Sequence, residues 1–323
     1  MQLQEALRLY LLVDRAHSTQ QTYERMLSRF VADLGPRRRL ENITPEDLDS
    51  YIADLRNRRV KYADHPTRPS VSEPLSPATV AKWVKTLKAF FNWCVRREYL
   101  TRSPARYLSN RRPTRIGEGK AARPDEVTEV LAAARYKPRD RAIVWLLAQS
   151  GCRAGDVAGL RLDRLDLANC SAVVDGKGDK RRRIHFETET AEAIAAWLAV
   201  RPPVDHPFVF VSTRGKGPLT SAAVSQIVRR LCQTAGLDRR LGAHAFRHYV
   251  GMTLARNRVA PAVIQQYLGH SNILTTMGYC AVVAEEDLRA ASRLLSLTKQ
   301  TPVAQLTLRR APGGWGHNRP KIE

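Results

Sequence analysis

Through the first hundred residues, apolar side chains recur three or four positions apart, which is the spacing of one face of an α-helix. The pattern predicts four helices: residues 3–13, a second that follows residue 18 and continues to 34, residues 44–58, and a fourth that begins near 76. The third starts with Thr44-Pro45-Glu46-Asp47. Proline fits the first helical position and acids complement the helix dipole, so this half is predicted to be an all-helical module.

Beyond about residue 121, helical and strand-like periods are mixed. Helices are predicted from residue 124, over 139–149, from 153, over 188–199, over 222–235, around 244–250, on either side of Gly269, and over 285–295. Short strands are predicted at 171–174 and 183–186, with a basic, glycine-containing turn between them, and 208–211 is a buried strand or extended segment. The second half is therefore predicted to be an α+β domain with a small antiparallel sheet.

A basic segment with glycines separates the two halves and reads as an exposed linker. The predicted organisation is a helical domain at 1–110, a basic linker at 111–123, an α+β domain at 124–297 and a mobile tail at 298–323, which lacks apolar periodicity. The fold class is therefore mainly α.

The charge balance identifies the class of partner. The 323 residues include 53 Lys and Arg against 31 Asp and Glu, a formal net charge of +22. Basic side chains neutralise phosphates and release counterions, which favours double-stranded DNA over the alternative of an acidic membrane surface. The sequence has neither a run of about 20 apolar residues nor a signal peptide, so we expect a cytoplasmic protein without membrane attachment.

Metal and disulfide chemistry are not indicated by the sequence. The five cysteines are odd in number and have no CxxC or Cys/His ligand spacing, which favours reduced thiols and no structural zinc. The Asp and Glu residues form no cluster with ligand-like spacing, which disfavours a metal-dependent nuclease. We therefore expect neither a metal nor a cofactor.

Basic side chains gather on one face of the predicted fourth helix, and no acid follows until Glu98. Such a face can simply be solvated, but in so basic a chain a phosphate-facing surface is favoured. The linker cations are either a localisation-like run or a strap along DNA, and their place between two domains favours the strap. The residues expected to contact DNA here are Lys82, Lys85, Lys88, Arg111 and Arg112.

Two Gly-Lys-Gly turns occur, at 176–178 and 215–217, and neither completes the GxxxxGK[ST] phosphate-binding motif. Lys177 lies at the tip of the predicted hairpin, where flanking glycines let the backbone approach DNA closely. Lys180 and Arg182 follow it and are expected to contact DNA as well. The second turn, with Lys216, precedes a predicted helix start.

Further candidate residues lie toward the end of the chain. His244 and Arg247 are three positions apart, so they share a helix face and together suit a phosphate. His270 lies in the turn after Gly269, and Tyr279 follows nine residues later on the next helix. Taken singly, these residues fit an ordinary helix-turn-helix with a packing tyrosine and a satisfied histidine equally well.

Arg153 is predicted to stand at the beginning of a short helix, where the helix dipole opposes a cation and an anion is needed. Asp156, one turn further on, could supply that anion through an ion pair, and so could a bound phosphate.

In this order, the candidate residues resemble the tyrosine recombinase (phage integrase) family. The residues that carry the resemblance are Arg153, Lys177, His244-Ala-Phe-Arg247, Gly269-His270 and Tyr279. The resemblance covers about residues 3–295 and is most specific in the second half; in the first, the Phe90-Phe91-x-Trp93 helix fits the family's core-binding domain. The chain departs from the family at Cys280-Ala281, where Thr-His is the commonest continuation, but no catalytic position is affected.

The resemblance implies a role for each residue. Tyr279 would attack a phosphodiester, Arg153 and Arg247 would bind the phosphate, and Lys177 would be the general acid for the leaving 5′-oxygen. His244 would assist proton transfer, His270 would hydrogen-bond the phosphate, and Asp156 would hold Arg153 in place.

The resemblance also implies a site-specific recombinase that works through a 3′-phosphotyrosyl intermediate and a Holliday junction. Such an enzyme would act as a homotetramer on two DNA sites, with the helix after Tyr279 exchanged between neighbours. Accessory DNA-bending or directionality proteins are conceivable partners. A type IB topoisomerase-like strand transferase and a non-catalytic DNA-binding protein of the same fold are the alternatives.

Overall fold

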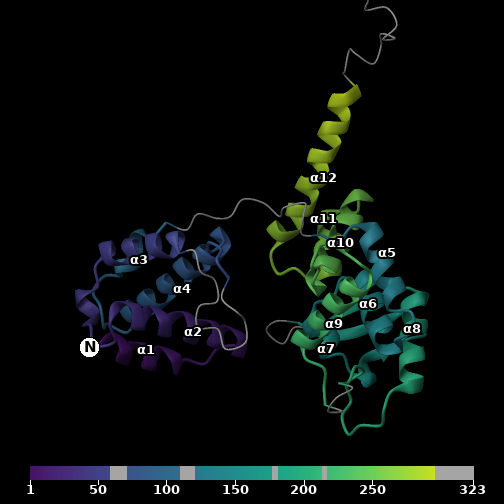
Figure 1. Ribbon diagram of the computed structural model, residues 1–323, viewed down its shortest axis with the longest axis horizontal. Coiled ribbons are helices and arrows are strands. Elements are labelled where there is room, and N and C mark those ends of the chain that lie inside the picture. Colours follow the sequence, from purple (N-terminus) through teal and green to yellow (C-terminus); the bar gives the residue numbers. More distant parts are fainter. Residues whose placement is uncertain (59–70, 110–120, 177–180, 213–216, 295–323) are drawn as a thin grey trace, which may run out of the picture. The chain divides into compact units, whose positions relative to one another are not determined.

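The computed structural model describes residues 1–58, 71–109, 121–176, 181–212 and 217–294. The chain divides into two compact units, Met1–Arg115 and Ile116–Glu323, called here the N-terminal and C-terminal units. Helices dominate both of them (Figure 1).

The described part of the N-terminal unit consists of α1 (Leu3–Leu11), α2 (His17–Leu34), the short turn η1 (Leu40–Asn42), α3 (Pro45–Asn57), α4 (Pro77–Arg96) and the short turn η2 (Pro104–Tyr107). Helix α3 begins as predicted. The Thr44 hydroxyl accepts a hydrogen bond from the Asp47 N–H, and the Asp47 carboxylate accepts one from the Thr44 N–H. This reciprocal pair satisfies donors that a helix start otherwise leaves unpaired.

Aromatic side chains on the predicted apolar stripes form much of the core of this unit. The Tyr10 ring of α1 meets the rings of Phe90 and Trp93 of α4 edge-on, with centroids 5.3 and 5.2 Å apart. The Phe30 ring of α2 meets that of Tyr51 of α3 at 5.1 Å. Such rings bury large apolar areas in defined orientations, so they fix how these helices pack on one another.

The C-terminal unit is built around a largely buried helix, α6. Its helices are α5 (Pro124–Ala133), α6 (Pro138–Ser150), α7 (Ala154–Ala158), the short turn η4 (Leu162–Arg164), α8 (Thr188–Val200), α9 (Ser221–Thr234), α10 (Ala243–Arg256), α11 (Pro261–Leu268) and α12 (Ile273–Leu294). In α6, the side chains of Ile143, Val144, Leu146 and Leu147 have no exposed area. A helix that is apolar on several faces is typically covered by neighbours all round, as α6 is here.

The small sheet has the strand order β1 (Leu165–Asp166), β2 (Ser171–Asp175), β3 (Arg181–His185) and is antiparallel throughout. Ala172 of β2 lies opposite Ile184 of β3, and both side chains face the core. The β2–β3 hairpin agrees with the sequence prediction. Strand β1 was not predicted, because two residues are too few to show an alternating pattern.

The apolar segment 208–211 is not part of the described three-stranded sheet. Isolated bridges pair Phe208 with Arg161 and Val211 with Pro218. Val209 is fully buried, and its carbonyl oxygen accepts a hydrogen bond from the Trp197 indole at 2.9 Å. The predicted burial of this segment is therefore confirmed, but it forms no regular strand, because residues 209 and 210 lie in a bend between the two bridges.

Tyr279 and the predicted helix at 285–295 lie on one continuous helix, α12 (Ile273–Leu294), rather than on two. Residues 280–284 contain neither glycine nor proline, so nothing in the chain interrupts the helix there. The expectation of a separate helix after Tyr279 was therefore wrong. In Figure 1, α12 extends well beyond the other helices of its unit.

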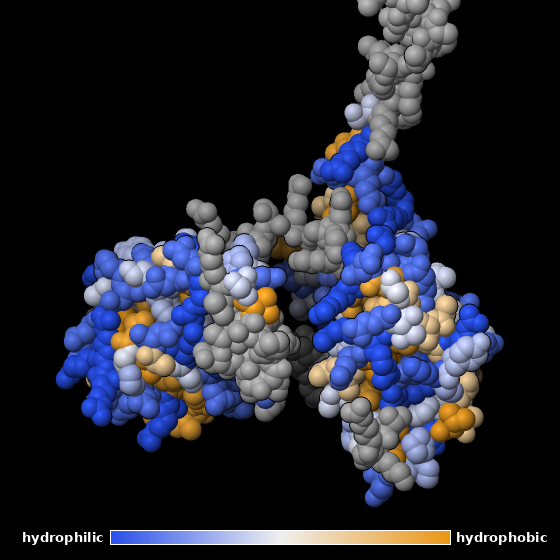
Figure 2. Space-filling model, viewed as in Figure 1, coloured by the Kyte–Doolittle hydropathy of each residue, from blue (hydrophilic) through white to orange (hydrophobic). Residues whose placement is uncertain are grey.

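These elements confirm the predicted fold class, which is mainly α with one small antiparallel sheet in the C-terminal unit. Hydrophilic residues cover most of the visible face of each unit (Figure 2). Among the described helices, none is long and apolar enough to cross a membrane.

Candidate functional site

Three elements of the C-terminal unit bring most of the predicted site residues together: the start of α7, helix α10, and the turn between α11 and α12. The clearest sign is the electrostatic environment of His270. After burial, the largest causes that lower its pKa are the charges of Arg247 and Arg153, followed by those of His244 and His248. These side chains therefore form one cluster around the His270 ring.

Arg247 is the most enclosed cation of the cluster, with 1% of its surface exposed. Its Nη1 donates to the Gly151 carbonyl oxygen at 2.9 Å, and its buried Nη2 has no hydrogen-bond partner among the described residues. Burial, and then the charges of Arg153 and Arg182, lower the pKa of Arg247 to about 10, so the group remains protonated at neutral pH. A buried cation with an unpaired donor favours an anion beside it.

Arg153 precedes α7 and is exposed at the same place. Its Nη2 donates to the Gly269 carbonyl oxygen at 3.1 Å. The Asp156 carboxylate accepts a hydrogen bond from the backbone N–H of Arg153 at 2.9 Å. Asp156 thus supports the backbone of Arg153, and its ion pair is with another arginine.

That arginine is Arg182 on β3, whose Nη2 lies 2.5 Å from the Asp156 carboxylate. Its Nη1 donates to the Tyr267 carbonyl oxygen at 3.3 Å, and its side chain is only 14% exposed. A Cβ on Gly269 would come within 2.6 Å of the Arg182 side chain, so this turn depends on a glycine. Such an enclosed position fits a supporting role for Arg182 better than the predicted contact with DNA.

His270 lies in the turn between α11 and α12, where Gly269 ends α11 in the left-handed conformation. Its Nδ1 is 2.8 Å from the Thr276 hydroxyl. Burial, followed by the charges of Arg247 and Arg153, lowers the pKa of His270 to about 4. The ring is therefore neutral at physiological pH and can still hydrogen-bond an anion.

Tyr279 packs inside the unit, between α12 and α10, and is 1% exposed. Its ring lies parallel to that of His270, with centroids 6.1 Å apart. Its hydroxyl oxygen is 3.0 Å from Nδ1 of His248. Burial raises the pKa of Tyr279, and the positive charge of Arg247 opposes that rise.

His248 is a site residue that the sequence patterns did not reveal. It is 9% exposed, and its ring centroid lies 4.5 Å from that of His244. It follows His244 by four positions, a spacing that places both rings on one helix face. That spacing was the available signal, but the His-x-x-Arg pair pointed to His244 alone.

Gly251 provides the surface on which the Tyr279 ring packs. A Cβ at this position would lie 2.6 Å from Cε2 of the Tyr279 ring and 2.7 Å from its Cζ, closer than any real contact. The tyrosine can occupy this position only because residue 251 has no side chain.

A hollow of about 350 Å³ opens beside α10. It is lined by Arg239, Arg240, Leu241, Gly242, His244, Ala245 and His248. His244 is exposed here, whereas Arg247 on the same helix is buried. The two residues of the His-x-x-Arg pair therefore differ in their access to solvent.

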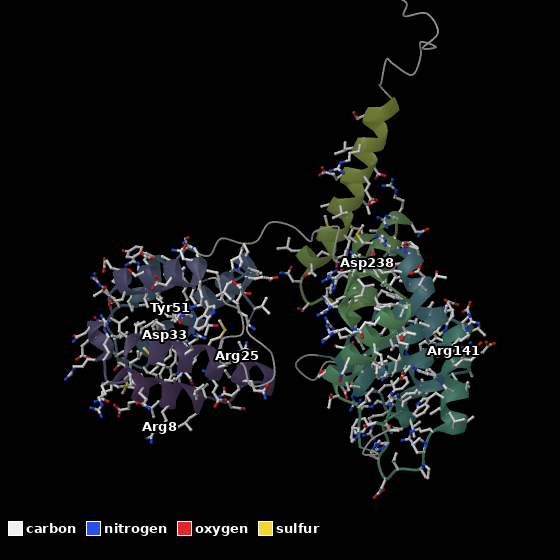
Figure 3. The ribbon with its side chains drawn as sticks, viewed as in Figure 1. Arg8, Arg25, Asp33, Tyr51, Arg141 and Asp238 are labelled. Carbon is white, nitrogen blue, oxygen red and sulfur yellow. The ribbon has the colours of Figure 1, made fainter. Side chains whose placement is uncertain are left out.

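Several residues that were predicted to act on DNA fall outside the described residues, namely Lys177, Lys180, Arg111, Arg112 and the rival lysine Lys216. On α4, Lys82 and Lys85 are exposed and Lys88 is half-buried. Other exposed arginines of the N-terminal unit include Arg8 on α1 and Arg25 on α2 (Figure 3).

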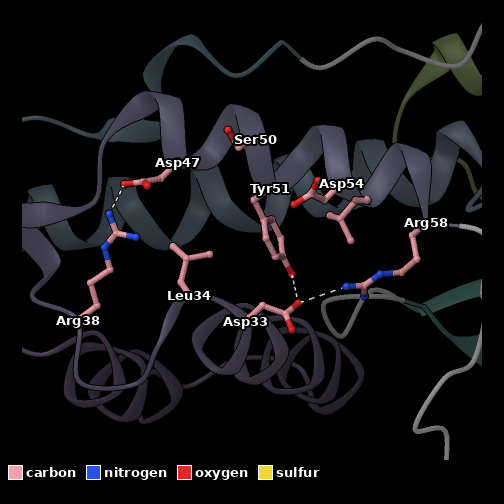
Figure 4. A pocket seen from close by; sticks show the side chains of 9 residues that line it. Asp33, Leu34, Arg38, Asp47, Ser50, Tyr51, Asp54 and Arg58 are labelled. Atoms are coloured by element: carbon pink, nitrogen blue, oxygen red, sulfur yellow. Dashed lines mark hydrogen bonds and ion pairs between the residues drawn. The ribbon is translucent and has the colours of Figure 1, made fainter.

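A second hollow, of about 280 Å³, lies on the N-terminal unit between α2 and α3 (Figure 4). Two of its three acids, Asp33 and Asp47, are engaged in contacts with neighbouring side chains. Arg38 pairs with Asp47 at 2.5 Å, and Asp33 accepts from the Tyr51 hydroxyl at 3.4 Å and pairs with Arg58 at 3.6 Å. These contacts tie the two helices together and give the hollow a structural explanation.

The described residues contain no group of three or more His, Cys, Asp or Glu side chains that could hold a metal ion. What the C-terminal cluster offers instead is a phenol, two guanidinium groups and three imidazoles. Together these groups can hold a phosphate, supply an oxygen nucleophile and move protons.

Comparisons with known proteins match both units of the chain. Residues 120–286 match the profile of the phage integrase family, and residues 2–101 match that of the phage integrase N-terminal SAM-like domain. A tyrosine recombinase XerC from Alcanivorax borkumensis is 29% identical over 287 residues, which is 82% of this chain and 90% of that protein. A tyrosine recombinase XerC from Corynebacterium efficiens is 31% identical over 233 residues, which is 68% of this chain and 73% of that protein.

Solved structures share the fold. The Tn1549 transposon integrase in complex with transposon right end DNA has a TM-score of 0.69 at 17% identity, covering 90% of this chain and all of that one. The XerH site-specific recombinase bound to a palindromic difH substrate has a TM-score of 0.65 at 22% identity. The match covers 86% of this chain and 80% of that one.

Proposed function

We propose, from the premise that this chain belongs to the phage integrase family, that it is a site-specific DNA recombinase with Tyr279 as its nucleophile. The observation that carries the proposal is the enclosed cluster in which Tyr279 lies beside His270 and within the electrostatic influence of Arg247. The net charge of +22 fits double-stranded DNA as the substrate.

The phosphate is held by two arginines. The unpaired Nη2 of Arg247 provides one donor, and the exposed guanidinium of Arg153 provides a second. As the phosphorus becomes five-coordinate, charge grows on its non-bridging oxygens, and fixed cations stabilise that charge without reorganising. His270, neutral and next to both arginines, adds a hydrogen bond to the phosphate.

In the cleavage step, the Tyr279 oxygen forms a bond to phosphorus while the bond from phosphorus to the 5′-oxygen breaks. The products are a 3′-phosphotyrosyl link and a 5′-hydroxyl. The leaving oxygen needs a proton, and we assign its delivery to Lys177. Arg182 supports this assignment, because its contacts hold the beginning of β3 at the site, and the segment with Lys177 directly precedes β3.

Strand exchange follows when the 5′-hydroxyl of a partner strand attacks the phosphotyrosyl link and releases Tyr279. Two such exchanges on one pair of strands give a Holliday junction, and two more resolve it. The number of phosphodiester bonds is conserved, so the reaction needs no ATP. In this scheme the two arginines and His270 stabilise the phosphate charge that a metal ion would otherwise stabilise.

The assembly in this proposal is a homotetramer on two DNA sites in the cytoplasm, with the N-terminal unit as a second DNA-binding surface. The solved relatives bound to DNA, together with the basic face of α4, support DNA as the partner. Exchange of strands between two duplexes, as opposed to relaxation of one supercoiled circle, separates this function from that of a type IB topoisomerase.

The test replaces the nucleophile. Tyr279→Phe removes one oxygen and keeps the ring that packs on Gly251, so the variant should bind DNA as the parent does. It should form no denaturation-resistant covalent complex with a nicked suicide substrate that carries its recombination site.

Tyr267→Phe is the matched control, because its hydroxyl donates to the carbonyl oxygens of Gln149 and His185 at 2.9 and 3.2 Å. This variant should still form the adduct. A covalent complex that persists in the Tyr279 variant and disappears in the Tyr267 variant would show that the nucleophile is misassigned. Persistence of the parent's adduct in EDTA tests the independence from metal.

A further inference from the structure

We infer that His248, and not His244, accepts the phenol proton of Tyr279 when the tyrosine attacks. This inference rests on the proposed function and adds a residue to its mechanism. The direct contact is the 3.0 Å separation between the Tyr279 hydroxyl and Nδ1 of His248. In the attacking state, the hydroxyl donates to that nitrogen.

Burial makes a proton acceptor necessary. Tyr279 is 1% exposed, so bulk water does not reach its hydroxyl, and the same burial raises the pKa of the phenol. The charge of Arg247 stabilises the phenolate but takes up no proton, because the pKa of Arg247 is about 10. The imidazole of His248, within hydrogen-bond distance of the reacting oxygen, is the group that can take it.

The proton then has a route to solvent. His248 and His244 both line the hollow of about 350 Å³ beside α10, and their ring centroids are 4.5 Å apart. In the step, the O–H bond of Tyr279 breaks, an N–H bond forms at Nδ1 of His248, and the oxygen bonds to phosphorus. His248 later returns the proton to Tyr279 when the phosphotyrosyl link is resolved, or loses it through the hollow.

The surroundings keep the phenol aligned for this transfer. Gly251 lies one helical turn after His248 and receives the face of the Tyr279 ring, which leaves no room for a Cβ. The His270 ring lies parallel on the tyrosine at 6.1 Å. His248 and Gly251 thus have different tasks: the histidine contacts the reacting atom, and the glycine positions the ring.

The test separates proton transfer from positioning. His248→Asn places an amide oxygen where Nδ1 stood, so it can accept a hydrogen bond but not a proton. With full-length protein and a nicked suicide substrate, covalent complex formation should slow by about 10²–10⁴, the usual contribution of a general base. DNA binding should be unchanged.

The diagnostic arm puts 3-fluorotyrosine at position 279 by stop-codon suppression. Its phenol is more acidic and therefore depends less on a general base, and the ring can turn its single fluorine away from Gly251. If His248→Asn has lost only the general base, 3-fluorotyrosine should restore its rate of adduct formation. The rate should then lie within about tenfold of that of the protein with His248 and 3-fluorotyrosine at position 279. The parent itself should change little.

Gly251→Ala is the positioning control. It should slow adduct formation by displacing the ring, and fluorotyrosine should not rescue it. The inference is overturned if His248→Asn reacts at the parent rate or if fluorotyrosine does not rescue His248→Asn. It is also overturned if fluorotyrosine rescues a His244→Asn variant instead. Failure of the proposed function looks different, because then the unmodified parent forms no covalent complex at all.

Discussion

At the scale of single residues, His270 shows how strongly the site alters an ionisation. Its pKa falls from 6.5 to about 4, first through burial and then through the charges of Arg247 and Arg153. In the unfolded chain, His270 is therefore protonated below about pH 6.5, whereas in the folded protein it is protonated only below about pH 4. The free energy of unfolding therefore decreases as the pH falls from about 6.5 to about 4.

We therefore expect His270→Asn to be less sensitive to acid than the parent. Urea unfolding at pH 7 and pH 5 gives the free energy of unfolding at each pH, and the loss between them should be smaller in the variant. His185→Asn is the control, because its side chain is exposed on β3, and it should keep the acid sensitivity of the parent. Equal losses in all three proteins would contradict the assigned pKa.

At the scale of secondary-structure elements, Arg182 joins three parts of the C-terminal unit: β3, the start of α7 through Asp156, and the end of α11 through Tyr267. Arg182→Ala should lower the free energy of unfolding by about 3 kcal/mol, because it leaves a buried carboxylate without its cation. Adduct formation should slow as well, because the support of Arg153 is loosened.

Arg181→Ala is the neighbouring control. Its side chain is 67% exposed and lies 3.7 Å from Asp175, so its loss should cost less than about 1 kcal/mol. If Arg182→Ala instead keeps its stability and loses salt-dependent DNA affinity, then Arg182 contacts DNA, as the sequence first suggested.

The assignment of Lys177 rather than Lys216 as the general acid can be tested with a modified substrate. Lys177→Ala should cleave an ordinary substrate about 10²–10⁴ times more slowly, because the 5′-alkoxide leaves poorly without a proton. A substrate with sulfur in the 5′-bridging position should be cleaved by this variant nearly as fast as by the parent, because a thiolate leaves unaided. Lys216→Ala should resemble the parent on both. Sulfur rescue of the Lys216 variant would reverse the assignment.

Sequence patterns identified the elements better than the side-chain partners. The predicted helices of the N-terminal half and the β2–β3 hairpin agree with the structure, because their periodicity follows directly from burial on one face. Helix α12 was split because apolar period alone does not show where one helix ends. The pairing of His248 with Tyr279 and that of Asp156 with Arg182 could not be predicted, since each joins residues at least 26 positions apart.

At the scale of the whole molecule, the distribution of charge should determine affinity. If the face of α4 binds phosphates, changing Lys82, Lys85 and Lys88 to glutamine should make the log–log dependence of binding on salt shallower. The slope should fall by up to about 0.9 for each phosphate that the variant no longer neutralises. The matched variant with three arginines keeps the charge and should keep the slope. An unchanged slope in the glutamine variant would mean that this face is only solvated.

The unbroken course of α12 has a mechanical consequence. One rod carries both Tyr279 and the exposed Leu288, and it continues to Leu294, about 22 Å beyond the tyrosine. If the helix turns as a rigid body, a torque applied to its far end would reach the phenol. Side chains reach about 5–6 Å from a helix axis, so a turn of about 30° would move the hydroxyl by about 3 Å. A displacement of that size would separate the hydroxyl from His248, so under the proposed mechanism we expect a partner that holds the end of this helix to change the rate at which Tyr279 reacts.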